Sequence, residues 1–319
     1  MSVIQRHKTL QLLHLLFHQN NSVLLSCCLF NARSVVNKVP ELHHILYCEN
    51  YDMLFITETW LTTEVSSGLL DPQSHYHIIR KDRSGSIGGG VAAFVKRNLV
   101  VSEVKIDNTF ADIELQCFDL VLNAKNKFRF FVVYRPPNYD EVAKNYLRLT
   151  IEGLKKYSGI SHSTITVGDF NLPKISWCDF TCGSDCFSTL FRDFVVTCGF
   201  YQFVKFITRE NSLLDLVLSS DTGIVCHITP KPTFGHSDHS MVNFKLNACS
   251  PFDSSATERR GDVTNGMKNI IDNCTYFWYK ADFVGLEQSL SQINWDTFIC
   301  LNPDATCVWT AFLCTVGYH

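Results

Sequence analysis

Short apolar runs alternate with amphipathic segments along most of the chain. Residues 22–30 and 51–57 are apolar at nearly every position, which favours strands that are buried on both faces. Between them the pattern predicts a helix, with Asn37 as its cap and Pro40 in its first turn. A strand–helix–strand order of this kind favours a parallel strand pair in an α/β domain.

The same alternation continues toward the C-terminus. Residues 142–157 have the spacing of an amphipathic helix, and a second helix is predicted over 187–198, ended by Gly199. Further strands are predicted at residues 76–79, 91–95, 113–122, 128–134, 163–167, 214–218, 224–229 and 241–246. Residues 61–74 are expected to be a loop. The glycine-rich run 85–90 precedes a strand instead of following one, so we interpret it as a flexible turn and not as a phosphate-binding loop.

Composition separates a central domain from its flanks. Residues 22–247 carry the patterns described above and are expected to form a single domain. Residues 1–21 are interpreted as a poorly ordered leader, because their Leu-rich run is interrupted by polar residues and lacks a signal-peptide cleavage site. Residues 248–275 begin with a stretch rich in Ser and Asp, which marks a linker to a final segment, residues 276–319.

Charge and cysteine content limit the class of protein. The 319 residues have a formal net charge of −3, so any binding to nucleic acid must use a local basic patch. The 14 cysteines form no regular framework, which favours reduced thiols in an intracellular protein that is not secreted. Cys178, Cys182 and Cys186 lack the spacing of a zinc site. No apolar run is long enough to span a bilayer, so no membrane association is expected.

Polar side chains follow six of the predicted strands. The set is Asn31, Glu58, Tyr134, Asp169 with Asn171, Asp215, and Asp238 with His239. Asp169 and Asn171 are two residues apart, and on an extended backbone such residues face the same side. One strand-end residue of this kind is more often a cap or turn residue. Six together favour a shared site, because open α/β sheets place their ligands at the strand ends.

The chemistry of this set suits hydrolysis of a phosphate ester. Glu58 is the best candidate ligand for a hard divalent cation, Mg²⁺ with Mn²⁺ as an alternative, and no small-molecule cofactor is expected. Asp169 is expected either to orient and deprotonate a water or to handle the proton of the leaving group. His239 is expected to donate a hydrogen bond to the scissile phosphate, with Asp215 fixing its tautomer. The phosphate oxygens would be positioned by Asn31, Asn171 and Tyr134.

These residues lie within motifs that occur in a recognisable order. The motifs are Asn31-Ala32-Arg33-Ser34, Glu58-Thr59-Trp60, Tyr134-Arg135-Pro136-Pro137, Gly168-Asp169-Phe170-Asn171, Asp215-Leu216-Val217-Leu218 and Ser237-Asp238-His239-Ser240. Over residues 22–247 they resemble the endonuclease/exonuclease/phosphatase family. The specific resemblance is to the apurinic-type endonuclease domain of non-LTR (LINE-type) retrotransposons.

The resemblance implies a fold, an activity and residue roles. The fold would be a four-layered α/β sandwich, with two packed mixed β-sheets flanked by helices, as in DNase I. The activity would be Mg²⁺-dependent nicking of a DNA duplex to leave a 3′-hydroxyl that primes reverse transcription, with a nuclear site of action. The resemblance also extends the active-site roles to the whole polar set and assigns metal binding to Glu58 and Asp238.

Two features depart from the relatives. Arg33 stands where cellular apurinic repair enzymes carry an acidic metal-site residue, which argues against repair-type activity at abasic sites. Residues 276–319 resemble the connector that precedes the reverse transcriptase in these elements, but no transcriptase follows. The chain is therefore interpreted as a truncated or host-captured element.

Basic residues near the glycine-rich run are candidates for contacts to the DNA backbone. Those around one predicted hairpin are Arg80, Lys81, Arg83, Lys96 and Arg97. Arg33 and Arg135, which lie within the motifs, are further candidates. A solvated charged face is an equally reasonable interpretation of the hairpin residues.

Two other functions stay open from the sequence. The first is a phosphatase of phosphoinositides or nucleotides, because the same fold supports that chemistry. The Tyr134-Arg135-Pro136-Pro137 motif and the connector argue against it. The second is a catalytically silent remnant, against which the complete polar set argues.

Overall fold

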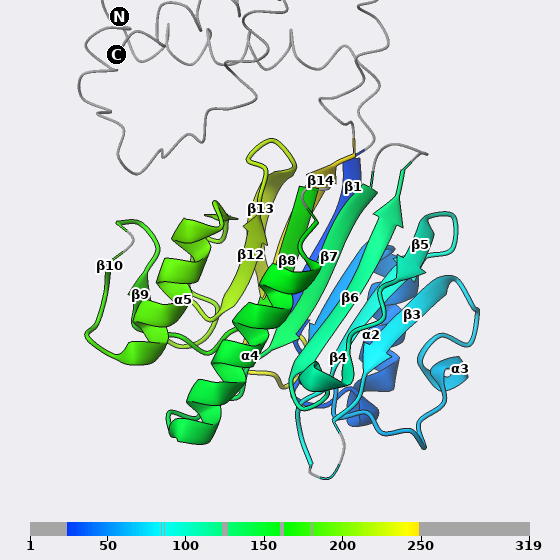
Figure 1. The fold of residues 1–319 in the computed structure, drawn as a ribbon. Coiled ribbons are helices and arrows are strands. Elements are labelled where there is room, and N and C mark those ends of the chain that lie inside the picture. The colour runs from blue at the N-terminus through cyan, green and yellow to red at the C-terminus, as the bar shows by residue number, and fades with distance from the viewer. Residues whose placement is uncertain are drawn as a thin grey trace, which may run out of the picture. The chain divides into compact units, whose positions relative to one another are not determined.

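Two six-stranded mixed β-sheets pack face to face, and helices cover the outer face of each sheet (Figure 1). The computed structural model describes residues 24–248, except for residues 84, 86, 123–126, 160–162 and 180. This arrangement confirms the predicted four-layered α/β sandwich. The predicted leader, the linker beyond Ala248 and the predicted connector lie outside the described residues.

The first sheet is built around a parallel pair. β1 (Leu24–Asn31) and β2 (Met53–Thr57) run parallel, with Asn31 opposite Thr57 at their C-terminal ends. The sheet order is β13-β14-β1-β2-β4-β3. Its antiparallel members are β13 (Val225–Thr233), β14 (Ser240–Asn247), β4 (Val91–Lys96) and β3 (Tyr76–Lys81). The central position of β1 and β2 explains why both are apolar at nearly every residue.

The second sheet aligns three polar strand-end residues across neighbouring strands. Tyr134 of β7 (Lys127–Tyr134) lies opposite Asp169 of the parallel strand β8 (Ser163–Asp169). Asp215 of the antiparallel strand β12 (Asp215–Ser219) lies opposite Asp169 on the other side. The full order is β11-β12-β8-β7-β6-β5. The remaining members are β11 (Tyr201–Gln202), β6 (Glu114–Val121) and β5 (Val100–Glu103).

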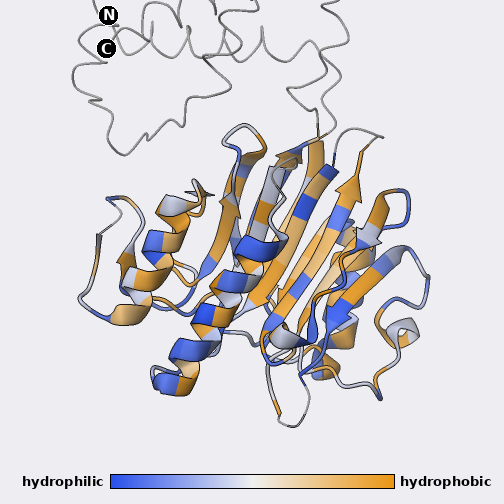
Figure 2. Ribbon diagram, viewed as in Figure 1, coloured by the Kyte–Doolittle hydropathy of each residue, from blue (hydrophilic) through white to orange (hydrophobic). Residues whose placement is uncertain are grey.

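Aromatic side chains fill the space between the sheets. Phe55 of the first sheet stacks on Phe130 of the second, with ring centroids 5.6 Å apart. Phe130 also stacks on Phe118 at 5.2 Å, and Phe55 on Phe244 at 6.2 Å. The strands carry much of the apolar sequence, shown in orange in Figure 2. Burial of this surface holds the sheets together and so fixes their polar ends relative to each other.

Two capped helices cover the outer face of the second sheet. α4 (Glu141–Tyr157) begins after Asp140, whose side chain accepts a hydrogen bond from the Ala143 N–H. α5 (Cys186–Thr197) begins after Asp185, whose side chain accepts one from the Ser188 N–H. Such caps satisfy backbone donors that have no partner within the helix. Both helices lie where the sequence predicts them, and the outer face of α4 is polar (Figure 2).

The helix predicted after Asn37 is divided into three short segments. They are a 3₁₀ turn (Val36–Lys38), α2 (Val39–His44) and a π-helical turn (Ile45–Glu49). Asn37 lies inside the first turn, so its prediction as the cap is wrong. Lys38 is buried and its Nζ donates to the Ala32 carbonyl, which ties the turn to the end of β1. Pro40 lies in the first turn of α2, as predicted.

Several short elements are absent from the predictions. α3 (Ser67–Leu70), capped by Ser66, lies within the segment predicted to be a loop. The other unpredicted elements are β5, β11, β9 (Ile175–Ser176), β10 (Thr181–Cys182) and a 3₁₀ turn (Asn108–Phe110). Elements of two to four residues are too short to produce a readable hydrophobic period.

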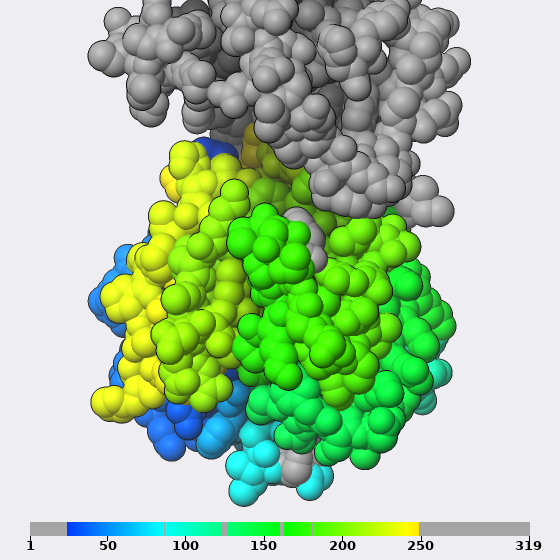
Figure 3. All heavy atoms as spheres, turned by 90° about the vertical axis from the view of Figure 1, so that its left-hand side faces the viewer, coloured from blue at the N-terminus to red at the C-terminus, as the bar shows by residue number. Residues whose placement is uncertain are grey.

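Segments that are distant in sequence share one surface of the unit formed by residues 23–250. In Figure 3, yellow residues of the C-terminal strands lie beside green residues from the middle of the chain, with blue residues from its N-terminal part next to them. Among the helices of the described residues, none has the length and apolar character needed to cross a membrane.

Candidate active site

The Asn31 side chain joins the polar ends of the two sheets. Its Nδ2 donates to Glu58 Oε1 at 3.0 Å and to Asp169 Oδ2 at 2.9 Å. Asn31 and Glu58 follow β1 and β2 of the first sheet, whereas Asp169 ends β8 of the second. Asn31 and Asp169 are fully buried, and Glu58 is half-buried. One amide therefore holds two carboxylates, one from each sheet, at a fixed separation.

A histidine–carboxylate pair lies next to this bridge. His239 Nδ1 is 2.7 Å from Asp215 Oδ2, and its Nε2 is 3.9 Å from Asp169 Oδ2. His239 precedes β14, so the first sheet supplies the imidazole while the second supplies both carboxylates. The Nδ1 contact leaves Nε2 directed toward Asp169. This arrangement fits the predicted roles of Asp215 as orienting group and His239 as hydrogen-bond donor.

Burial and charge shift the pKa of both central groups. Burial is the main cause that raises the pKa of Asp169 to about 8, and the nearby Asp215 carboxyl adds to it. For His239, burial lowers the pKa, but the hydrogen bond to Asp215 and the surrounding carboxylates outweigh it and raise the pKa to about 9. The imidazole is therefore protonated at neutral pH, and both of its nitrogens can donate.

The Asn171 segment reaches the site by a turn and not by strand alternation. β8 ends at Asp169, and Asn171 has a left-handed backbone with φ 50°. Its N–H donates to Asp169 Oδ1 at 3.0 Å, and its Nδ2 donates to the Arg135 carbonyl at 2.8 Å. The expectation that both residues share one side of an extended strand is therefore wrong. Asn171 meets Asp169 because the chain turns back on itself.

Arg135 lies inside the protein. Its side chain is fully buried, and its guanidinium donates to the Asn171 carbonyl at 3.1 Å. It also lies 5.0 Å from the ring centroids of Tyr139 and Phe187. This placement differs from the expected contact with the DNA backbone. Arg135 instead supports the turn that carries Asn171.

Tyr134 contributes a buried hydroxyl at the end of β7. Burial raises the pKa of this hydroxyl most, followed by the charges of Glu58 and Asp169. The hydroxyl therefore keeps its proton and can donate. The Arg83 guanidinium lies 5.7 Å from the centroid of the Tyr134 ring and pairs with the buried Glu114. Arg83 and Glu114 form an ion pair within the protein. The charge of Arg83 is therefore neutralised by Glu114, which differs from the expected contact with a DNA phosphate.

The glycine-rich run packs against the segment that carries Glu58. The Thr59 N–H donates to the Gly90 carbonyl at 3.2 Å, and the Trp60 N–H to the Gly89 carbonyl at 2.8 Å. Gly90 has φ +83°, and a Cβ at this position would lie 2.5 Å from Thr59 Oγ1. Gly89 and Gly90 are thus hydrogen-bonded and closely packed against residues 59–60, and this part of the run is not the flexible turn that was expected. Sequence alone showed the glycines but not what they contact.

Asp238 is held by two arginines. Its carboxylate lies 3.3 Å from Arg33 Nη1 and 2.8 Å from Arg209 Nε. Burial opposes ionisation, but its backbone hydrogen bond and these arginines lower the pKa of Asp238. Arg209 was not among the predicted site residues, since it lies in a loop without a motif. Arg33 is half-exposed at the rim, where a contact with DNA stays a prediction.

The basic residues of the predicted hairpin do not form one patch. Arg80 donates to Asp82 and to the Thr62 carbonyl, and Lys81 donates to the Phe110 carbonyl. Lys81 lies opposite Val91, at the end of the β3–β4 pair next to the active site. Lys96 and Arg97 lie at the other end, about 16 Å away at the usual rise per strand residue. The expected cluster is therefore divided by the length of a strand.

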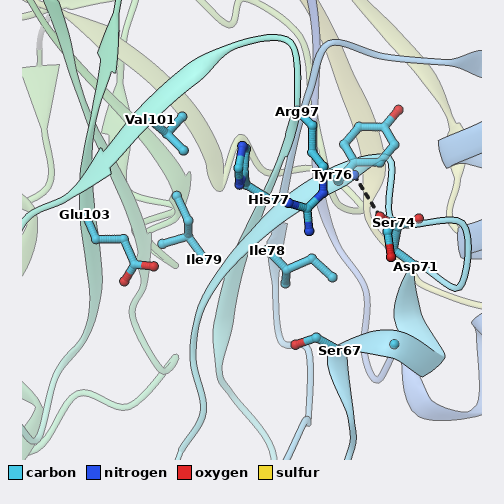
Figure 4. A pocket seen from close by; sticks show the side chains of 11 residues that line it. Ser67, Asp71, Ser74, Tyr76, His77, Ile78, Ile79, Arg97, Val101 and Glu103 are labelled. Carbon is cyan, nitrogen blue, oxygen red and sulfur yellow. Dashed lines mark hydrogen bonds between the residues drawn. The ribbon is translucent and has the colours of Figure 1, made fainter.

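A cavity of about 570 Å³ lies between the edge strands β3 and β5 (Figure 4). It is lined by Tyr76, His77 and Arg97, among others, and so lies at the end of the β3–β4 pair opposite Lys81. The predicted catalytic residues are not in it.

The residues at the site fit a hard divalent cation. Carboxylate and amide oxygens are the ligands that Mg²⁺ prefers, and Glu58 offers a half-buried carboxylate at the rim. Ligand atoms of Asp169, Asp215 and His239 also lie within 4.8 Å of one another. However, Nδ1 of His239 is already bonded to Asp215, and its Nε2 is protonated in the cationic form. Glu58 is therefore the better ligand candidate.

Comparisons with known proteins agree with this geometry. A family model described as endonuclease-reverse transcriptase matches residues 128–243, which include β7, β8, β12 and the turn before β14. The resemblance to the endonuclease/exonuclease/phosphatase family is confirmed. No curated protein sequence matches the chain.

Several solved structures share the fold of this chain. The endonuclease domain of TRAS1, a telomere-specific non-LTR retrotransposon, superposes with a TM-score of 0.56 at 12% identity, covering 71% of this chain and 99% of that one. An AP endonuclease from Archaeoglobus fulgidus gives 0.55 at 16% identity, with 70% and 99% covered. The 3′ phosphatase NExo from Neisseria, bound to product DNA hairpin, gives 0.53 at 12% identity, with the same coverage. At these identities the superpositions establish the fold of this chain, the two-sheet α/β sandwich.

Proposed function

We propose that the protein is a divalent-metal-dependent endonuclease that hydrolyses a phosphodiester bond in duplex DNA. The observation that carries this proposal is the Asn31 bridge between Glu58 and Asp169, with the His239–Asp215 pair beside it. In this proposal Glu58 holds the metal, Asp169 is the base and His239 is the electrostatic donor, and the Asn31 bridge and the 3.9 Å contact between His239 and Asp169 support a shared site for them. The similar structures support the choice of substrate, because one is named as a retrotransposon endonuclease domain and another is a 3′ phosphatase bound to product DNA.

The metal would be held by Glu58. Asp238, the second predicted ligand, pairs through both carboxylate oxygens with Arg33 and Arg209, and it would have to exchange one of these partners to bind the ion. Mg²⁺ is favoured and Mn²⁺ is an alternative, since both accept oxygen ligands. When bound, such an ion neutralises charge that develops on the phosphoryl oxygens.

Asp169 accepts the proton of the attacking water in this proposal. Burial and the neighbouring Asp215 raise its pKa, so the ionised carboxylate binds a proton more tightly than an exposed aspartate does, which suits a general base. Asn31 fixes one carboxylate oxygen and the Asn171 N–H the other, so the carboxylate cannot rotate. Because the Asp169 carboxylate is already fixed, little conformational entropy is lost when the attacking water is aligned with the phosphorus atom.

His239 stabilises the phosphate. Its protonated Nε2 donates to a non-bridging oxygen as charge develops there, while Asp215 holds the ring from behind. The buried hydroxyl of Tyr134 supplies a further donor on the opposite side of Asp169 in the sheet register. Attack of the water on phosphorus breaks the P–O3′ bond and leaves a 5′-phosphate and a 3′-oxygen. This oxygen takes a proton from solvent water and becomes a 3′-hydroxyl, which would prime reverse transcription in a retrotransposition cycle at a nuclear site.

The test is nicking of supercoiled plasmid with Mg²⁺. Wild-type protein should produce open circles that a DNA polymerase extends, and His239→Ala and Asp169→Asn should each reduce the rate by about 100-fold or more. Leu69→Ala, an exposed residue on α3, is the control that should match wild type. Equal background nicking by wild type and both catalytic variants would reject the proposal.

The alternatives give different outcomes in the same preparation. Release of inorganic phosphate from phosphoinositides or nucleotides without nicking would identify a phosphatase. Neither activity, together with a melting temperature unchanged by millimolar Mg²⁺, would identify a silent remnant.

A further inference from the structure

A surface pocket of about 780 Å³ adjoins Glu58. Three segments of the chain form it: residues 34–37, residues 60–63, and Asp82 and Arg83 with the first part of the glycine-rich run, Gly85, Ile87 and Gly88. Trp60 connects it to the active site, because the indole Nε1 donates to Glu58 Oε2 at 3.3 Å. The pocket therefore lies directly beside the candidate metal ligand.

Exposed apolar side chains are concentrated in this pocket. Val36 is 42% exposed, Trp60 37% and Ile87 90%, and these are three of the eight exposed large hydrophobic residues found in the described part of the chain. Isolated exposed apolar residues are common on protein surfaces. Three in one hollow next to a catalytic centre indicate a site that removes an apolar ligand surface from water.

Backbone contacts hold Trp60 in place. The Ser34 N–H donates to the Glu58 carbonyl and the Val35 N–H to the Thr59 carbonyl, both at 2.9 Å. Trp60 itself has a left-handed backbone with φ 54°, and its N–H donates to the Gly89 carbonyl. A left-handed conformation is costly for a bulky residue, so the surrounding bonds must maintain it. The indole is thus presented to the pocket by a rigid frame.

We propose that this pocket binds a nucleobase that flanks the cleaved phosphodiester, with Trp60 as the stacking surface. This inference rests on the proposed nuclease function. A base has a flat apolar face for the indole, and its polar edge can meet the pocket's polar lining, which includes Asn37, Thr62 and Asp82. Arg33, half-exposed and next to Ser34 in the chain, supplies positive charge for the adjoining phosphate. The hydrogen bond from Trp60 to Glu58 keeps the stacked base close to the phosphodiester that is cleaved.

The experiment combines protein and DNA variants. After the nick in a duplex oligonucleotide has been mapped, each flanking base is removed in turn, leaving an abasic sugar. Wild-type protein should lose roughly 5- to 150-fold in kcat/KM when the stacked base is missing, the range that corresponds to base–aromatic stacking. Trp60→Ala should cleave intact DNA more slowly and show no further loss at that abasic position.

Two further variants separate stacking from other effects. Trp60→Phe keeps an aromatic face but removes the Nε1 donor to Glu58, so it should retain the dependence on the base. Leu69→Ala, which removes an apolar side chain that is 53% exposed on α3 and outside the pocket, should behave as wild type. If wild type and Trp60→Ala are equally sensitive at every position, the pocket assignment is wrong while the nuclease function stands.

A binding measurement covers the case in which wild type cleaves no DNA. That outcome would reject the proposed function. The pocket would then be tested by binding of an oligonucleotide that contains 2-aminopurine, in buffer without divalent metal. Quenching of its fluorescence by wild type and Trp60→Phe, but not by Trp60→Ala, would support the pocket. Equal quenching by all three proteins, or none by wild type, would overturn it.

Discussion

Asp215 Oδ2 lies 2.7 Å from His239 Nδ1, and the two side chains are 0% and 2% exposed. At this depth the carboxylate sets both the charge and the orientation of the imidazole. We predict that Asp215→Asn lowers the nicking rate by about 100-fold or more, because the protonated ring loses the partner that stabilises it. The measurement is single-turnover cleavage of a duplex oligonucleotide.

The double variant shows whether the two residues act as one unit. Adding Asp215→Asn to His239→Ala should change the rate little, since the carboxylate then has no imidazole to orient. Independent, multiplying losses would show that Asp215 acts on the substrate by another route.

The position of Asn31 between two carboxylates leads to a stability prediction. Asn31→Asp replaces the Nδ2 donor by a third negative oxygen facing Glu58 at 3.0 Å and Asp169 at 2.9 Å. Without added metal this variant should be less stable than Asn31→Ala, which removes the donor but adds no charge. We expect a difference of about 1–3 kcal/mol in urea unfolding at pH 8. Equal stability of the two variants would show that the amide is not the bridge described above.

Gly168 is required by the close approach of two strands. A Cβ at this position would lie 1.8 Å from the Val133 carbonyl oxygen, inside the hydrogen-bonded β7–β8 pair. Gly168→Ala must separate the strands that carry Tyr134 and Asp169, so it should cost about 3 kcal/mol or more of unfolding free energy. Gly223→Ala is the matched control, because the nearest atom to its Cβ would be 3.4 Å away. Similar losses in both variants would contradict the steric explanation.

Much of this fold could be predicted because its central strands are long and apolar. The apolar runs that form β1, β2 and β8 are buried within the sheets. A strand buried on both faces is apolar at nearly every position, so its central location can be predicted from the sequence. The parallel pairing of β1 with β2 followed from the helix between them. The polar residues at the strand ends were predicted to share a site. In the structure hydrogen bonds join Glu58, Asn31, Asp169 and Asn171, and the His239–Asp215 pair lies 3.9 Å from Asp169 through His239 Nε2.

What the sequence did not reveal depends on contacts between distant segments. Arg135 resembles a DNA-binding residue until the fold buries it under Tyr139 and Phe187. Arg83 likewise pairs with Glu114 from another strand. The sequence of a motif does not show whether a charged residue in it binds a DNA phosphate or pairs with a carboxylate from another part of the same chain. That information exists only in the packing of the two sheets.

Acid stability should depend in part on Asp52. Its Oδ2 accepts hydrogen bonds from the N–H and hydroxyl of Ser26, both at 2.8 Å, and its Oδ1 lies 3.0 Å from Lys96 Nζ. Burial alone would raise the pKa of Asp52, but these donors outweigh it and lower the pKa below the ordinary value of 3.8. A lowered pKa in the folded state stabilises the protein above the unfolded value, and this stabilisation is lost as the pH falls through the folded value.

Asp52→Asn should therefore be less stable than wild type at pH 6, with the difference shrinking as the pH falls below 3.8. Urea unfolding at pH 6 and pH 3 measures this change. Asp112→Asn, at an exposed turn, controls for the general effect of removing one negative charge. Other carboxylates destabilise all three proteins in acid, so the informative quantity is the difference between wild type and each variant. A difference for Asp52→Asn that is the same at both pH values would show that the Ser26 and Lys96 contacts do not favour the ionised carboxylate.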